Sequence, residues 1–432
     1  MGLSALLWPA AAWAQGADAI DPAEIRQLIE QNRRLQAEVA SQQRTIEDLR
    51  SRVNAIEQAS TNNQRELQNL EDQAAPVPAS EPPPVADSPG QAVRISAETG
   101  FAFFASGSDG LYANGEFKID DAKVFLEAPI SKDLYFHAEL DLQTRESEDN
   151  NFHLGEIYAE YELPDGSFNL RVGRMYIPFG EEYQVRGVMD NPLVSHSLSD
   201  LWGMDEGVEI FGSLGKFSYF GAVQDGGINT LRNYHSDKSV ALRAGYDPTS
   251  RAHFSASAMR TGHLNPTLDE LSALWFGNGF FRALGPNATT TEFWANLAEL
   301  DGSVHWRDGH LKAAGGLVQF DDNNPAANDT RHLSYYYIEG VQHLSDPLYG
   351  AVRFSQINAP GGYPIAGQGS MSEYFFTNIM TSSISRVTVG LGYSFSAPTL
   401  LKIEYSPEWG NTTTGEHRDE ENLFSTELAV KF

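Results

Sequence analysis

The chain has 432 residues, of which 41% are hydrophobic, and its formal net charge is −28 at pH 7. This length allows one large domain with an extension, and the charge argues against nucleic acid as a partner, because nucleic-acid binding needs basic patches. There is no Cys, which excludes disulfides and thiolate metal sites, and no apolar run of about 20 residues that would predict a transmembrane helix.

Residues 1–14 are typical of a secretory signal peptide. An apolar core covers residues 3–12, and Ala12 and Ala14 form an A-x-A cleavage site. The usual basic residues before the core are missing, which suggests that translation starts further upstream. The alternative interpretation is a frayed apolar terminus.

Residues 15–73 predict a periplasmic coiled coil. Between residues 21 and 73, two sets of mostly apolar residues recur every seven positions for about seven heptads. Val39, Ile46 and Val53 in one set, with Leu in the other, favour dimers. The alternative is a lone solvated helix, although a helix of this length needs a partner. A proline-rich linker is predicted to follow at residues 74–91.

From residue 92 to the end, apolar and polar residues alternate with a period of two, which predicts β-strands. Tight turns and long polar connections alternate between the strands, as they do in outer-membrane barrels of even strand number. Sixteen strands are predicted near residues 93–104, 117–128, 134–145, 152–163, 168–177, 206–214, 217–225, 239–247, 252–261, 291–306, 310–320, 332–344, 348–357, 384–395, 400–406 and 422–432. The long connections are predicted at residues 178–205, 226–238, 262–290, 321–331, 358–383 and 407–421.

The alternation favours lipid outside and water inside. A soluble sandwich would alternate too, but sixteen strands are unusually many for one such domain. Aromatic residues at strand ends are typical of membrane girdles; they are Phe168, Phe217, Trp294, Trp306, Phe395 and Phe432. The sequence therefore predicts an all-β, 16-stranded antiparallel transmembrane β-barrel over residues 92–432, preceded by an N-terminal α-helical coiled coil.

Residues 173–180, with the sequence Gly-Arg-Met-Tyr-Ile-Pro-Phe-Gly, resemble the signature of the phosphate-selective porin O and P family. The sixteen-strand layout and the N-terminal coiled coil are similar to that family too. The final Phe432 resembles the C-terminal assembly signal of bacterial outer-membrane proteins. The family resemblance implies a homotrimeric channel for phosphate or other anions, with residues 181–205 folded into the lumen as a constriction.

The charge departs from this family pattern. Residues 92–432 hold 23 Lys and Arg against 45 Asp and Glu, whereas a phosphate pore works through rings of Lys and Arg. The channel-lining residues predicted from strand parity are Glu139, Asp141, Glu156, Glu160, Arg171, Arg243, Lys312, Arg353, Arg386 and Lys402. Each one alone is more often a hydrated wall residue than a selectivity element.

Arg174 is an exception to the pattern. Its parity with Val172 places it on the lipid side, where Arg is costly at mid-depth. Either a bulge turns it inward or it lies at a contact between protomers.

We expect an outer-membrane porin for passive diffusion of small polar or ionic solutes, bound to outer-membrane lipid and lipopolysaccharide, with its coiled coil in the periplasm. One alternative is an envelope tether or spacer anchored by the barrel. Another is a hydrolase built into the barrel, although no catalytic, cofactor or metal motif is present.

Overall fold

The computed structural model describes residues 93–143, 153–201, 203–226, 236–265, 290–324, 329–374 and 379–432, all within the unit Pro89–Phe432. The predicted signal peptide, coiled coil and linker, at residues 1–14, 15–73 and 74–91, lie outside the described residues. Their assignments stay predictions.

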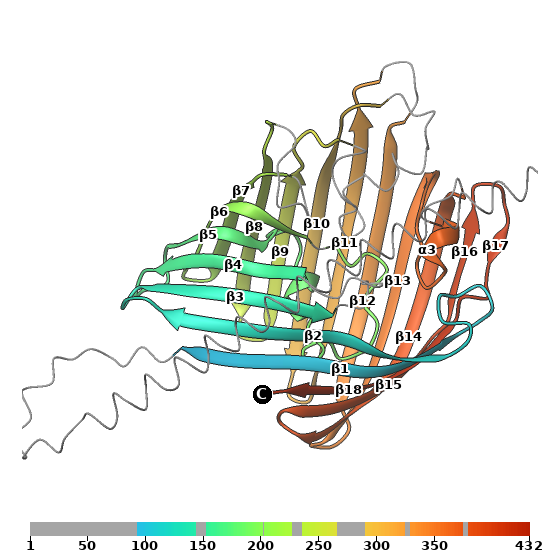
Figure 1. Ribbon diagram of the computed structural model, residues 1–432, viewed down its shortest axis with the longest axis horizontal. Helices are drawn as coiled ribbons and strands as arrows, with labels where there is room; N and C mark the ends of the chain where they lie inside the picture. Colours follow the sequence, from blue (N-terminus) through green and yellow to red (C-terminus); the bar gives the residue numbers. More distant parts are fainter. Residues whose placement is uncertain are drawn as a thin grey trace, which may run out of the picture. The chain divides into compact units, whose positions relative to one another are not determined.

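The described residues form one antiparallel sheet (Figure 1). Its strands are β1 (Arg94–Ser106), β2 (Glu116–Pro129), β3 (Leu134–Gln143), β4 (His153–Glu162), β5 (Asn169–Tyr176), β6 (Met204–Leu214), β7 (Phe217–Gln224), β8 (Ser239–Thr249), β9 (Ala252–Arg260), β10 (Phe293–Trp306), β11 (Gly309–Asp322), β12 (Arg331–His343), β13 (Leu348–Tyr363), β14 (Thr381–Ser396), β15 (Thr399–Ser406), β16 (Glu408–Thr412), β17 (His417–Arg418) and β18 (Leu423–Lys431). Two short helices, η1 (Glu182–Val185) and α3 (Met371–Tyr374), lie in connections.

The sheet closes on itself. From β1 to β15 each strand pairs with the next, β15 pairs with β18, and β18 pairs with β1. β15 and β16 both pair with β14, and β17 pairs with β16, so β15–β16 and β17–β18 are each one interrupted strand. Over the described ranges this confirms the predicted 16-stranded antiparallel barrel, a form that leaves no open sheet edge.

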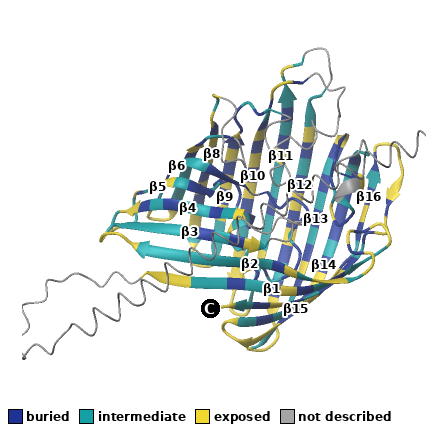
Figure 2. Cartoon of the chain, viewed as in Figure 1, coloured by how far each residue is buried: buried dark blue, intermediate teal, exposed yellow. Residues whose placement is uncertain are grey.

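Side chains alternate between the two faces of the wall, as the period of two requires. On β8, Val240 and Leu242 are exposed, whereas Ala241 and Arg243 are buried. Figure 2 shows the same change from buried to exposed along β8 to β13. Away from the strand ends the outer face is therefore apolar, and charged residues such as Arg243, Glu339 and Arg353 point inward.

Aromatic side chains lie exposed near several strand ends. Phe217, Trp306, Phe395 and Phe432 are all exposed. Exposed apolar and aromatic side chains over a whole outer surface would be unfavourable in water and are favourable in lipid. In the part of the chain that the structure describes, no helix is long and apolar enough to cross a membrane.

Some predicted boundaries are wrong. Residues 407–421, predicted as a loop, contain β16 and β17, and β13 continues to Tyr363 rather than ending at residue 357. Pro407 has no N–H to donate, which interrupts the ladder between β15 and β16 without ending the strand. Outside the apolar band a strand is polar on both faces, so the period-two signal disappears there.

The hydrophobic core lies inside the barrel. Ile177, Phe179 and Leu198, from the connection between β5 and β6, pack with inward side chains of the wall such as Leu297 and Ile384. This connection, residues 177–201, is called the inner loop below.

Candidate functional site

The inner loop begins where β5 can no longer pair. Pro178 lacks the N–H that a further ladder bond needs, and Gly180 has a φ of +67°, which favours glycine. The Gly180 N–H donates to Ser257 Oγ (3.0 Å), and its carbonyl accepts from Arg243 Nη1 (2.5 Å). Because Ser257 and Arg243 are inward residues of β9 and β8, the chain turns into the barrel here.

Cationic side chains of β13, β14 and β15 hold the far part of the inner loop. Lys402 Nζ donates to the carbonyls of Val188 (2.8 Å) and Leu193 (3.0 Å). Arg353 Nη1 donates to the Ser195 carbonyl at 2.7 Å. Arg386 likewise donates from Nη1 to the carbonyl of His196 at 3.1 Å.

Acceptors on the same strands take the N–H groups of the inner loop. Glu404 accepts from Val194 N (2.7 Å) and from Ser195 N (3.0 Å), and Ser355 Oγ accepts from Leu198 N (3.2 Å). Buried backbone groups need such partners, because each unpaired one costs about 1–3 kcal/mol. Side chains of the barrel wall therefore supply the hydrogen bonds that this irregular segment does not form in a β-ladder.

We call Arg353, Arg386, Lys402 and Glu404 the loop wall. Its three cations also meet carboxylates on neighbouring strands. Arg353 Nε donates to Glu339 Oε2 (2.9 Å), Arg386 Nε donates to Glu408 Oε2 (2.7 Å), and Lys402 Nζ lies 2.7 Å from Glu427 Oε2. Each positive charge of the loop wall is therefore balanced by a carboxylate on a neighbouring strand.

Glu182 is a buried carboxylate of the inner loop itself. It accepts from Ser197 N (2.8 Å) and Ser197 Oγ (2.6 Å), which ties the two limbs of the loop together. Burial and the nearby Asp200 carboxylate raise the pKa of Glu182 to about 7. Arg186 and Asp200 form a second tie between the limbs.

A second group of charges lines the inner face of β2 to β5. We call Lys123, Glu139, Asp141, Glu156, Glu160 and Arg171 the acidic wall. Arg171 Nη2 lies 2.6 Å from Glu160 Oε2, and Arg171 Nη1 lies 3.2 Å from Glu209 Oε1. Its guanidinium also stands 4.2 Å from the ring centroid of Tyr158. One cation is thus shared between two carboxylates and fixed by a ring.

Lys123 is surrounded in a similar way. Its Nζ lies 3.0 Å from Glu139 Oε1 and 3.9 Å from both Asp121 Oδ2 and Asp141 Oδ1. Glu156 accepts from Tyr176 N at 3.0 Å. Among the six residues of the acidic wall, carboxylates outnumber cations four to two.

Eight of the ten predicted lining residues thus lie in two groups. Arg353, Arg386 and Lys402 belong to the loop wall, and Glu139, Asp141, Glu156, Glu160 and Arg171 belong to the acidic wall. Arg243 binds the start of the inner loop, and Lys312 is the cross-strand neighbour of Glu339. That these ten residues line a conducting channel stays a prediction.

Sequence reasoning missed Lys123 and Glu404. Glu404 stands two positions from Lys402 and so shares its face, a signal that could have found it. Lys123 lies on the same face of β2 as Asp121, in a run of charges without a clear alternation.

Arg174 keeps its outward parity. β5 pairs with β4 and β6 in unbroken register, with Arg174 opposite Ile157 and Glu206, so the predicted alternative of a bulge is wrong. Arg174 Nη1 donates to Glu206 Oε1 (3.0 Å) and Nε donates to the Leu154 carbonyl (3.3 Å). The residue stands two positions from the end of β5, where an outward charge costs only about 0–1 kcal/mol. A contact between protomers at this point stays a prediction.

The chain was compared with known families, curated proteins and solved structures. No protein-family model and no curated protein matches it. The outer membrane channel DcaP of Acinetobacter baumannii is similar with a TM-score of 0.53 and 12% identity, over 79% of this chain and 97% of that one. OmpT, an outer membrane protein of Vibrio cholerae, is similar with a TM-score of 0.52, 12% identity and the same coverage.

An anion-selective porin from Comamonas acidovorans is similar with a TM-score of 0.50 and 9% identity, over 79% of this chain and 99% of that one. At such identities the likeness concerns the fold alone. The described part of the chain has the fold of outer-membrane porins, with a closed barrel and a connection folded inside it.

Proposed function

We propose that the chain is an outer-membrane porin, a water-filled channel for passive diffusion of small polar and ionic solutes. The porin fold and the apolar, aromatic-flanked outer face support a place in the bacterial outer membrane. Sixteen strands enclose an aqueous lumen in barrels of this kind. The inner loop narrows that lumen from one side.

We further propose a preference for cations over anions. The observation that carries this preference is the pairing of five inward cations: Lys123, Arg171, Arg353, Arg386 and Lys402 each lie within 4.0 Å of a carboxylate. Selectivity in a pore follows the charges left unbalanced along its wall. The acidic wall holds four carboxyl groups against two cations, and this excess of acidic groups favours cations.

Phosphate selectivity, which the resemblance of residues 173–180 implies, has less support. A phosphate site needs guanidinium or ammonium groups whose N–H bonds are free to meet it. The loop wall supplies such groups but directs them to the inner loop and to Glu339, Glu408 and Glu427.

A trimer with a periplasmic N-terminal arm completes the proposal. One of the structures similar to this chain is a trimer form of Vibrio cholerae OmpT. In a trimer, three copies of residues 15–73 would meet at an effective concentration of roughly the millimolar range, which favours a three-stranded coiled coil.

Planar-bilayer recording tests the channel. Full-length protein from outer membranes should give stepwise conductance increments in KCl. Absence of any conductance from protein that migrates as a folded barrel would contradict the proposal and favour a barrel that serves only as an anchor.

A further inference from the structure

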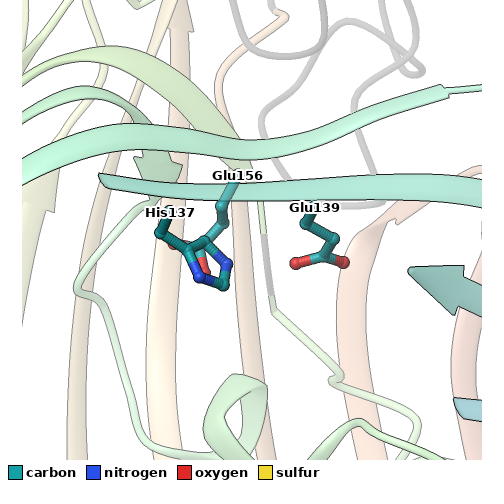
Figure 3. A group of neighbouring side chains, drawn as sticks. All are labelled: His137, Glu139 and Glu156. Carbon is teal, nitrogen blue, oxygen red and sulfur yellow. The ribbon is translucent and has the colours of Figure 1, made fainter. Parts of the chain in front are cut away.

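Two carboxylates of the acidic wall and a neighbouring histidine converge in a way that the channel does not require. His137 and Glu139 come from β3 and Glu156 comes from β4, and one donor atom from each lies within 4.8 Å of the others. Figure 3 shows all three leaving the two strands on the same side. One imidazole and two carboxylates form a donor set that binds divalent cations.

A β-bulge brings the group together. Ala138 pairs with Ile157 and Leu140 pairs with Leu154, so Glu139 alone faces both Gly155 and Glu156. Such a bulge redirects side chains and is frequent beside functional sites. A Cβ on Gly155 would come within 2.5 Å of Glu139 Cγ, so the Glu139 side chain occupies space that only glycine leaves free.

Each member is held in place by a neighbour outside the group. The His137 ring stacks on Tyr158, with centroids 5.0 Å apart and planes at 23°. Tyr176 N donates to Glu156 Oε1 (3.0 Å), which leaves the other carboxylate oxygen for a ligand. Supports of this kind orient the ligands of protein metal sites.

Glu139 is the buried member of the group. It is 3% exposed, and its Oε1 accepts no hydrogen bond. Lys123 Nζ forms an ion pair with this oxygen at 3.0 Å, without hydrogen-bond geometry. Lys123 is thus the cation that meets this oxygen, and a bound metal ion would share the buried Glu139 carboxylate with it.

We propose that His137, Glu139 and Glu156 bind a divalent transition-metal cation of the Zn²⁺, Co²⁺ or Cu²⁺ type at the wall of the lumen. Imidazole with carboxylates suits these metals better than Ca²⁺ or Mg²⁺, which take oxygen ligands. Ligands in a tetrahedral zinc site stand about 3.4 Å apart, so movements of about 1 Å in the side chains complete the site. Water fills the remaining positions.

This inference adds a ligand site to the proposed channel. It rests on the proposed function only in assuming that solutes pass the site. A site of three protein ligands that is open to water holds a cation without retaining it permanently, as conduction requires. The sequence predicted no metal site, because the three residues have no metal-ligand spacing until the bulge in β4 places Glu156 beside Glu139.

The test is Cu²⁺ binding to the full-length protein, purified in detergent without a histidine tag. Electron paramagnetic resonance should show one site per chain with nitrogen coupling from one imidazole, and Zn²⁺ should displace the Cu²⁺ whereas Ca²⁺ in tenfold excess should not. His137→Ala should remove the nitrogen coupling. Glu156→Gln and Gly155→Ala should each weaken binding by at least about tenfold, the scale of losses at metal sites whose support is removed.

His305→Ala is the matched control, because it removes an imidazole from the only close histidine pair among the described ring contacts, with the rings of His305 and His310 5.4 Å apart. Its Cu²⁺ signal should match that of the unchanged protein. Circular dichroism identifies folded barrels, and Glu156→Gln serves if His137→Ala does not fold. Equal Cu²⁺ affinity and equal nitrogen coupling in His137→Ala and the unchanged protein would overturn the proposal.

Binding and conduction are measured separately, so the two proposals can fail independently. Cu²⁺ binding needs no open channel, and KCl conductance is recorded without transition metals. If the barrel conducts, Zn²⁺ should reduce its conductance in the unchanged protein and in His305→Ala, but not in His137→Ala. Equal reduction in all three would count against the site.

Discussion

The loop wall and the acidic wall are made of the same kind of strand and the same types of charged residue, but their charges have different partners. In the loop wall, Arg353 and Lys402 each bind a carboxylate on the next strand and carbonyls of the inner loop. In the acidic wall, Lys123 and Arg171 each lie among several carboxylates. A cationic side chain that faces the lumen is therefore not sufficient to make a channel selective for anions.

The cations of the two walls also differ in burial. Lys402 and Glu427 are each about 1% exposed, and desolvating such a pair costs several kcal/mol per ion unless further hydrogen bonds compensate. The carbonyls of the inner loop supply these bonds. On the acidic wall, Glu139, Asp141 and Glu160 are buried too, but both cations, Lys123 and Arg171, are only half-buried.

The largest effect is expected on the loop wall. Lys402→Met removes the donor to three inner-loop carbonyls and leaves Glu427 without its cation. The expected loss is about 3–5 kcal/mol, typical of breaking one side of a buried ion pair. Thermal unfolding in detergent should shift to lower temperature, and single-channel conductance should rise because the inner loop is released.

The double variant Lys402→Met with Glu427→Gln is the control for this prediction. It removes both charges, so its loss of stability should be clearly smaller than that of Lys402→Met alone. Unchanged thermal stability and conductance in Lys402→Met would show that the inner loop does not depend on the loop wall.

An intermediate effect is expected on the acidic wall. Asp141→Asn together with Glu156→Gln removes two of the four carboxyl groups of the acidic wall and no contact to the loop wall. We expect the ratio of K⁺ to Cl⁻ permeability to fall about threefold, since wall charges set the ion preference of wide pores. Asp165→Asn, in the turn between β4 and β5, should leave the ratio unchanged; equal ratios in all three proteins would place the selectivity elsewhere.

The smallest effect is expected from the pH dependence of the inner loop. The pKa of Glu182 is about 7 in the docked loop against 4.5 for a free carboxyl. The docked state therefore binds the proton more tightly, so docking should strengthen as pH falls from 7 to 4.5 and weaken as pH rises through about 7. Hydrogen exchange of residues 182–200 should be slower at pH 5 than at pH 8, after correction for the intrinsic rate.

Glu182→Gln tests this assignment. Glutamine cannot ionise, so the corrected exchange rates of this variant should be the same at both pH values. A pH dependence that persists in Glu182→Gln would assign the effect to another group, with Asp200 as the nearest candidate.

The fold could be predicted from the sequence because strand periodicity is a local signal. On β8, Val240, Leu242 and Arg243 show the two faces directly. The polar ends of strands could not be predicted, as β16 illustrates, because outside the membrane no alternation is required. Closure of the barrel followed from the even number of strands and the alternating connections.

The roles of individual charges could not be predicted from the sequence. Parity placed Lys402 and Arg353 inward, but the groups they bind in the inner loop are 214 and 158 residues away along the chain. The period of two along a strand gives no information on contacts between positions so far apart in the chain. The bulge that places Glu139 beside Glu156 could not be predicted from the sequence either. The additional residue in β4 does not visibly interrupt the alternation of apolar and polar residues.

The central claim is that five inward cations are paired with carboxylates, so that the acidic wall determines the ion preference. The reversal potential of the unchanged protein in a KCl gradient across a planar bilayer tests this most directly. The account predicts the sign of a cation-preferring channel, with K⁺ more permeant than Cl⁻ and no block by phosphate. A potential of the opposite sign, with Cl⁻ more permeant and phosphate blocking, would contradict it.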